Sequence, residues 1–184
     1  MPIPFQIDQR GWLAGIERVE SPNFDARPDD CPIRLIVVHG ISLPPGEYGG
    51  PYIRDLFCNR LDPAVHDYFA AIYQMRVSAH CLVEREGHLV QFVSFDHRAW
   101  HAGESSWQGL TRCNDFSVGI ELEGCDDEAY TDAQYQTLAS LIQSLRNQYS
   151  AIDRDALVGH SDIAPARKTD PGPAFDWEKL RQLV

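Results

Sequence analysis

The stretch Ile33–Gly40, IRLIVVHG, gives the strongest strand signal in the chain and decides its fold class. Residues 33–38 are almost all β-branched or leucine, and a short continuous apolar run of this kind indicates a strand buried on both faces. The run ends at His39, and the segment SLPPGEYGGP at residues 42–51 then breaks the chain with prolines and glycines. Ligands of open α/β sheets bind at strand ends, so His39 is a candidate site residue.

Segments on both sides of this strand alternate between strand and helix patterns. Two strands joined by a turn at residues 85–87 are expected within residues 78–93, SAHCLVEREGHLVQFV. Residues 116–124, FSVGIELEG, predict another central strand, and residues 156–160, ALVGH, predict a short one that ends at His160. Residues 21–32 are polar and predict a loop.

Three helices are expected. One follows Pro63 over residues 64–75, with Val65, Phe69 and Ile72 on one side. Thr131 and Gln134 form a capping-box pattern that opens a helix over the following residues to Tyr149, and Asp176 can cap a last helix through Leu183. The mixture predicts an α/β fold: one domain over residues 1–184, with a central mixed β-sheet flanked by helices and residues 1–10 peripheral.

Composition narrows the class of function. The chain has 184 residues, 43% of them hydrophobic, and a formal net charge of −11, so a real core is expected and non-specific nucleic-acid binding is not. We expect no membrane partner, because no segment is apolar over a bilayer's width and no secretory signal begins the sequence. Five widely spaced cysteines favour a reducing cytoplasm over a disulfide framework. We expect a monomer.

A metal site is one interpretation of the two strand-end histidines. Asp170 lies ten positions beyond His160, across a loop that contains Pro165. Two imidazoles and a carboxylate suit a catalytic Zn²⁺ that keeps a fourth position for water. The spacing is not specific, and taken alone it favours ordinary hydrogen-bonded loop residues over a metal site.

The strand GIELEG carries two carboxylates. Alternation places Glu121 and Glu123 on one face of the strand, which is either a solvated face or a face turned to the site. In the second case Glu121 could move protons, and Lys168 could act on developing negative charge. A surface position is the alternative for Lys168.

The remaining histidines and cysteines have simpler interpretations. His97 and His101 in HRAWH lack the glutamate of a helical zinc motif, so they are expected to be structural or to line a groove. His80 and Cys81 fall in an apolar strand and are expected in the core, whereas His66 and His88 are expected at the surface. Cys113 has no evident base beside it and is a poor candidate nucleophile.

Several motifs together resemble one known family. They are VVHGISLPPGEYGGP, RVSAHCLVEREG, RAWHAG, CNDFSVGIELEG, YTDAQYQTLA and GHSDIAPARKTDPGPAFDW, which span the chain from about Gly11 to its end. The pattern is similar to the amidase-2 family of zinc amidases, which have the peptidoglycan-recognition fold. It is most similar to the cytoplasmic members that recycle cell-wall fragments. These cleave the amide between the lactyl group of anhydro-N-acetylmuramic acid and L-alanine, and thereby affect β-lactamase induction.

The resemblance implies a role for each candidate residue. Zn²⁺ would be held by His39, His160 and Asp170, with Glu121 as the general base and Lys168 stabilising the oxyanion. Arg76 and Arg112 would meet the sugar and the carboxylates of a small-molecule muropeptide substrate, because the arginine fork pairs with carboxylates.

One residue departs from the family pattern, which commonly has asparagine where this chain has Gly40. The departure lowers the expected affinity for the sugar and leaves the strictness for the anhydro form open. Some proteins of this fold bind muropeptides without a metal and without cleaving them. The joint presence of His39, His160, Asp170, Glu121 and Lys168 favours the enzyme over such a binding module.

Overall fold

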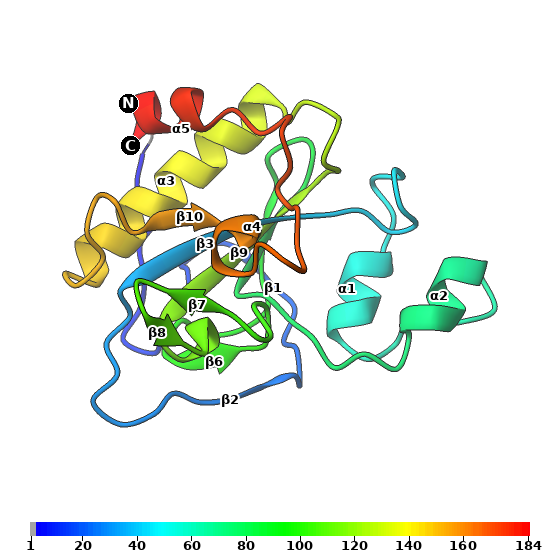
Figure 1. Ribbon diagram of the computed structural model, residues 1–184, viewed down its shortest axis with the longest axis horizontal. Coiled ribbons are helices and arrows are strands. Elements are labelled where there is room, and N and C mark those ends of the chain that lie inside the picture. Colours follow the sequence, from blue (N-terminus) through cyan, green and yellow to red (C-terminus); the bar gives the residue numbers. More distant parts are fainter. Residues whose placement is uncertain (1–2) are drawn as a thin grey trace.

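The computed structural model describes residues 3–184, and a six-stranded mixed sheet forms its centre (Figure 1). The strand order is β1-β5-β4-β9-β3-β10, and β3 pairs in parallel with both β9 and β10. The pair β4–β5 is antiparallel, as the turn at residues 85–87 predicts, and this makes the sheet mixed. The predicted fold class is confirmed.

The elements are short apart from two strands and one helix. The strands are β1 Glu17–Arg18, β2 Phe24–Ala26, β3 Leu35–Ile41, β4 Cys81–Val83, β5 Leu89–Gln91, β6 His97–Ala99, β7 Ser106–Trp107, β8 Leu110–Thr111, β9 Ser117–Glu123 and β10 Leu157–Gly159. The helices are α1 Tyr52–Phe57, α2 Asp67–Ile72, α3 Asp132–Gln148, α4 His160–Ile163 and α5 Trp177–Leu183, with a 3-10 turn at Cys113–Asp115.

The buried hydrophobic side chains form two groups around the sheet. The larger group joins α3 and α5 to β3 and β9, and it includes Leu138, Ile142 and Leu180. The smaller group joins α1 and α2 to β4 and β5. Figure 1 shows α3 and α5 together on one side and α1 with α2 apart from them. Every residue of β9 is buried, so the central strand is covered on both faces.

Local signals explain most of the element boundaries. The β3 strand runs beyond the apolar stretch to Ile41, because its last residues pair with Leu122 and Glu123 of β9. The capping box at Thr131 and Gln134 opens α3, and Asp176 caps α5, both as predicted.

Two predictions about the flanking segments were wrong. The helix over residues 64–75 is only α2, because His66 adopts an extended backbone and its ring Nδ1 accepts a hydrogen bond from the Tyr68 amide at 3.0 Å. Val65 therefore precedes the helix and is 52% exposed, while Phe69 is buried. The polar stretch at residues 21–32 contains the strand β2, which pairs with β6 in a separate two-stranded sheet.

Other expectations concern the chain as a whole. Within residues 3–184, no helix is both long enough and apolar enough to cross a bilayer. Near the start of the chain, the Phe5 amide donates a hydrogen bond to Ser144 Oγ of α3 at 2.7 Å. Residues 1–2, part of the predicted peripheral segment, lie outside the described residues.

Replacing Thr131 with alanine should lower the free energy of unfolding by about 1 kcal/mol, because a helix loses its side-chain cap. Thr131 Oγ1 accepts from the Gln134 amide at 3.1 Å and donates to the Arg85 carbonyl at 2.6 Å, so it also ties α3 to the β4–β5 turn. Chemical denaturation would measure the change. Thr131→Ser keeps both bonds and serves as the control, and equal stability of Ala and Ser variants would contradict the prediction.

Candidate metal centre and active site

Parallel strands bring the candidate residues to one edge of the sheet. His39 lies near the end of β3, and its register partner on β9 is Glu121. The neighbouring strand β10 ends at Gly159, and His160 follows directly as the first residue of α4. Because β9, β3 and β10 run in the same direction, their ends meet, and residues far apart in sequence come together there.

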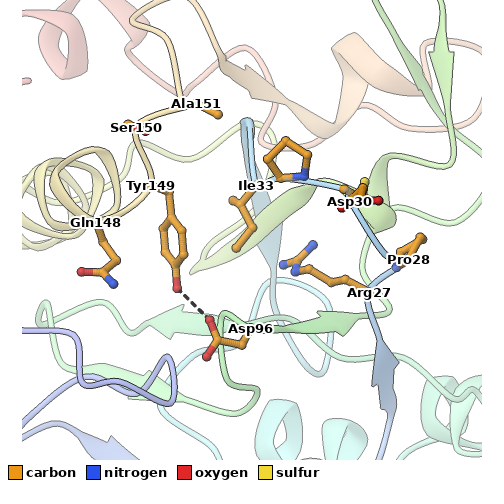
Figure 2. A pocket seen from close by; sticks show the side chains of 11 residues that line it. Arg27, Pro28, Asp30, Ile33, Asp96, Gln148, Tyr149, Ser150 and Ala151 are labelled. Carbon is orange, nitrogen blue, oxygen red and sulfur yellow. Dashed lines mark hydrogen bonds between the residues drawn. The ribbon is translucent and has the colours of Figure 1, made fainter.

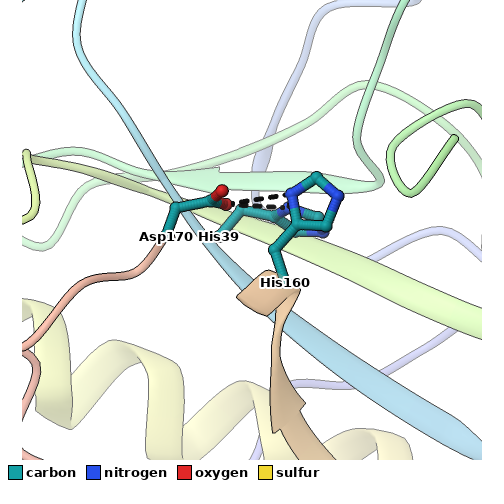
Figure 3. Close-up of side chains that lie close together, drawn as sticks. All are labelled: His39, His160 and Asp170. Carbon is teal, nitrogen blue, oxygen red and sulfur yellow. Dashed lines mark hydrogen bonds and ion pairs between the residues drawn. The ribbon is translucent and has the colours of Figure 1, made fainter. Parts of the chain in front are cut away.

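Three side chains converge tightly at this edge (Figure 3). His160 Nδ1 lies 2.9 Å from His39 Nδ1 and 3.1 Å from Asp170 Oδ2. The distance from His39 Nδ1 to Asp170 Oδ2 is 3.3 Å. The three ligand atoms all lie within 4.8 Å of one another, and both imidazoles are buried. Two imidazole nitrogens and a carboxylate oxygen turned to one point form a donor set that a metal ion could occupy.

The protonation states of these groups also fit a metal. Burial lowers the pKa of His39 to about 4, which favours the neutral imidazole that a metal requires. Burial alone would raise the pKa of Asp170, but hydrogen bonds with His160 and His39 hold it far below its usual range. His160 Nε2 lies 3.3 Å from the Ala102 carbonyl, which can only accept. With a metal in the site, the hydrogen of a neutral His160 would sit on Nε2, and the Nδ1 lone pair would bind the ion in place of the contact with Asp170.

The two glutamates of β9 differ sharply in their surroundings, although they share one face. Glu123 accepts hydrogen bonds from the amides of Gly49 at 2.6 Å and Arg85 at 3.1 Å, so it anchors loops to the sheet. Glu121 is 8% exposed, and its Oε2 has no hydrogen-bond partner among residues 3–184. The face is therefore not a solvated one, and Glu121 is the carboxylate available for chemistry.

The electrostatics of Glu121 suit proton transfer. Burial raises its pKa well above the usual range, and the nearby charge of Asp170 raises it further. The positive charge of Lys168, which lines the same cavity, opposes both effects on the pKa. A buried carboxyl that binds a proton more readily than usual can take one from a nucleophile and return it to a leaving group.

A cavity of about 500 Å³ gives access to these residues. His39, His160, Asp170, Glu121 and Lys168 all line it, so the structure brings all five candidates together. The opposite part of the lining is apolar and comes from the loop after β3, α1, α2 and the segment before β4. These residues include Leu43, Leu56, Phe57, Ile72 and Val77.

The two predicted arginines lie outside this cavity. Arg76 is exposed, and its guanidinium donates to the Gln74 carbonyl at 3.1 Å. Arg112 is exposed as well, pairs with Asp115 at 3.2 Å and borders a separate hollow next to residues 163–167. The structure does not bring either arginine to the histidine cluster.

Most of the other histidines follow the sequence expectations, but His97, expected to be structural or to line a groove, is exposed on β6. His80 and Cys81 are fully buried. His66 and His88 are exposed. His101 lines the cavity, and its Nδ1 lies 2.9 Å from His39 Nε2. Sequence reasoning missed that contact, because a spacing of 62 residues carries no signal for it.

A larger hollow, of about 730 Å³, lies elsewhere and carries no comparable chemistry (Figure 2). Arg27 projects into it between β2 and the end of α3, but its guanidinium already donates to the carbonyls of Phe95, Asn114, Asp115 and Ser117. Tyr149 Oη donates to Asp96 at 3.4 Å across the same hollow. These groups hold segments of the fold together.

Comparisons with known proteins agree with the geometry. The family model described as N-acetylmuramoyl-L-alanine amidase matches residues 29–173. The chain belongs to this family. It is therefore an amidase, which is a kind of hydrolase. The chain is also similar in sequence and structure to individual amidases of known name.

The chain is 60% identical to the 1,6-anhydro-N-acetylmuramyl-L-alanine amidase AmpD of Escherichia coli over 96% of both chains. A crystal structure of a selenomethionine AmpD derivative superposes with a TM-score of 0.94 at 60% identity, covering 97% of this chain and 99% of the other. The amidase AmiD of Escherichia coli, in complex with the substrate anhydro-N-acetylmuramic acid-L-Ala-D-γ-Glu-L-Lys, is similar with a TM-score of 0.61 and 28% identity. That match covers 96% of this chain and 65% of the AmiD chain.

Gly40, where the family resemblance suggests asparagine, packs closely against the side chain of Tyr130. A Cβ atom on Gly40 would lie 2.3 Å from Tyr130 Oη, so any side chain here requires the tyrosine to move. Tyr130 Oη donates to the Pro171 carbonyl at 3.0 Å, directly after Asp170. Gly40 thus leaves room for a tyrosine that fixes the backbone next to a site residue.

Proposed function

We propose that this amidase hydrolyses the amide between the lactyl group of 1,6-anhydro-N-acetylmuramic acid and L-alanine in small muropeptides. The observation that carries the proposal is the buried, unpartnered carboxylate of Glu121 beside the cluster of His39, His160 and Asp170. The likeness to AmpD over nearly the full length, and to AmiD with its anhydromuramyl peptide, supports the substrate class. The reaction belongs to the recycling of peptidoglycan.

Zn²⁺ is the proposed cofactor, held by His39, His160 and Asp170. The nitrogen–oxygen donor set, the low pKa of the buried His39 and the contact of His160 Nε2 with the Ala102 carbonyl support this assignment. When bound, zinc supplies a Lewis acid that polarises a carbonyl and lowers the pKa of a water molecule to about 7.

The side chains around the cluster would carry the proton and charge transfers. Glu121 takes a proton from the attacking water and delivers it to the amine of L-alanine as the amide breaks. Lys168 faces the same cavity and stabilises the negative charge on the former carbonyl oxygen. Glu121 and Lys168 together would thus account for both the proton transfers and the charge stabilisation.

Arg76 and Arg112 are proposed to meet the sugar and the peptide carboxylates. Both are exposed and lie beyond the cavity, so they would contact the ends of an extended substrate rather than the scissile bond. Their local positive charge would attract an anionic ligand although the chain as a whole has a net charge of −11. We further propose a cytoplasmic monomer whose removal of muropeptides limits β-lactamase induction.

Product analysis with a defined substrate tests the reaction. An anhydromuramyl tripeptide incubated with the enzyme should yield anhydro-N-acetylmuramic acid and a tripeptide with a free α-amine, both identifiable by mass spectrometry. The matched muropeptide with a reducing sugar measures how strictly the anhydro form is required. Binding without cleavage, or cleavage of any other bond, would contradict the proposal.

Purified, untreated protein should contain one zinc ion per chain, and Asp170→Ala should lose most of it. The reason is that two neutral imidazoles without the carboxylate leave the ion with fewer ligands and no charge compensation. Elemental analysis by mass spectrometry measures the content, and Asp153→Ala, which removes an exposed aspartate, is the control. Zinc-free protein that gains no activity from added zinc would refute the assignment.

A further inference from the structure

The segment His101–Ala102 contacts the Nε2 atoms of both histidines of the cluster. His101 Nδ1 lies 2.9 Å from His39 Nε2, and the Ala102 carbonyl lies 3.3 Å from His160 Nε2. Each contact therefore involves the ring nitrogen that points away from Asp170. A metal-binding histidine commonly donates its second ring N–H to such a partner, which fixes the ring orientation and the tautomer.

Hydrogen-bond directions in this region form one consistent chain. Ser117 Oγ lies 2.6 Å from the Cys113 carbonyl, which accepts only, so the serine hydrogen points there. Ser117 Oγ is then the acceptor for the contact of 3.0 Å with His101 Nε2. With its hydrogen on Nε2, a neutral His101 has a lone pair on Nδ1.

The last link of the chain reaches His39. The lone pair on His101 Nδ1 accepts the hydrogen of His39 Nε2. A neutral His39 that carries its hydrogen on Nε2 exposes a lone pair on Nδ1, which faces His160 and Asp170. The opposite arrangement would place a hydrogen on the nitrogen that must bind a metal.

The fold builds a dedicated position for the His101 ring. A Cβ atom on Gly119 would lie 2.3 Å from His101 Cγ, so the ring occupies space that only a glycine on β9 leaves. Because side chains alternate along a strand, Ser117, Gly119 and Glu121 lie on the same face of β9. The His101 ring over Gly119 therefore lies on the face that carries Glu121. Asn114 Oδ1 accepts from the amides of His101 at 3.2 Å and Ala102 at 2.8 Å, and it fixes the backbone of the segment.

We propose that His101 is a positioning residue for zinc, because it holds His39 in the tautomer that presents Nδ1 to the ion, with Ser117 fixing His101 in turn. The Ala102 carbonyl does the same for His160. The inference rests on the proposed zinc site. It assigns a task to a histidine that is not one of the three proposed ligands, and it gives a reason for Gly119 and Ser117 to precede Glu121 on β9.

Zinc affinity measured by competition with a chromophoric chelator tests this role. His101→Leu should weaken zinc binding about 10–100-fold, the usual effect of losing a partner behind a metal ligand. His101→Asn offers an amide oxygen in place of Nδ1 and should restore part of the loss. Ser117→Ala should also lower the affinity for zinc, although Ser117 touches none of the three ligands.

The matched control is Ser144→Ala. Ser144 is also buried and makes two hydrogen bonds, with the Phe5 amide and the Ser140 carbonyl, but on α3, away from the cluster. Its replacement should leave zinc affinity unchanged. A wild type that binds no zinc would refute the proposed function itself. A wild type that binds zinc while His101→Leu and Ser117→Ala bind it equally well would overturn only the positioning role.

A second measurement decides the matter if the variants fail to fold. Nitrogen-15 NMR of the zinc-loaded wild type, above pH 7, reports which ring nitrogen carries the hydrogen. We expect it on Nε2 of His39, His101 and His160. A hydrogen on Nδ1 of His39 would overturn the inference whatever the variants do.

Discussion

Replacing Glu121 with alanine should leave zinc bound and lower kcat by about 10²–10⁴-fold, the usual contribution of a general acid–base group. Glu121 is the register partner of His39 and lines the same cavity as the cluster. The proposed task of its carboxylate is to accept the proton of water and return it to the amine, and alanine cannot do either. The effect should therefore appear in kcat rather than in binding.

Stability should move in the opposite direction from activity. A buried polar atom without a partner costs about 1–3 kcal/mol, and Glu121 Oε2 is such an atom. Glu121→Ala removes this cost, and the vacated volume adjoins the cavity rather than a closed core. We expect a melting temperature equal to or above that of the wild type, which is typical when a residue is kept for function at the expense of stability.

Glu123→Gln is the matched control for this experiment. Glu123 lies on the same face of the same strand, but its two carboxylate oxygens accept separately from the Gly49 and Arg85 amides, and glutamine keeps one of these two bonds. This variant should retain wild-type kcat. Steady-state kinetics on the anhydro-muropeptide, together with zinc analysis and thermal unfolding, give the comparison. A Glu121→Ala enzyme with near-normal kcat would show that the carboxylate takes no part in the chemistry.

The parts of the fold that could be predicted depend on local signals. The strand β3 follows from a continuous apolar run, and α3 follows from a capping box with buried residues at helical spacing. The prediction failed where a tertiary contact overrides a weak local pattern. The His66 cap shortens α2, and pairing with β6 turns part of a polar stretch into β2.

The site shows the same limit. Strand ends marked His39 and His160 as candidates, but only the parallel pairing of β3 with β10 brings their rings together. Sequence alternation placed Glu121 and Glu123 on one face without separating their tasks, because the amides that occupy Glu123 come from distant loops. His101 was assigned correctly to structure or groove, yet its contact with His39 is visible only in three dimensions.

Replacing Lys168 with alanine should reduce kcat and kcat/KM by similar factors, about 10²–10³-fold. Attack on the amide places negative charge on the former carbonyl oxygen, and a positioned ammonium stabilises that charge only as it develops. Loss of one comparable donor costs about 2.7–4 kcal/mol in the transition state. Substrate binding should change little, because the neutral amide oxygen of the ground state attracts the ammonium far less.

The position of Lys168 supports this expectation. Its positive charge lowers the pKa of both Glu121 and His39. Lys168 lies two residues before Asp170, and both side chains line the same cavity. The backbone between them is held, since the Lys168 amide donates to the Ala164 carbonyl at 2.9 Å and the Asp170 carbonyl accepts from the Ser161 amide at 3.0 Å.

Two further variants distinguish a role in the reaction from a general effect of charge. Lys179→Ala removes a lysine that pairs with Asp132 at the start of α3, away from the cavity, and should leave both kinetic constants unchanged. Lys168→Met keeps most of the side-chain volume and removes only the charge, so it should match the alanine variant if charge is what matters. A raised KM with unchanged kcat would instead make Lys168 a binder of a substrate carboxylate, because that interaction is equally strong before and during the reaction. Unchanged kcat and KM would mean that the ammonium stays in solvent, whatever its proximity to Glu121.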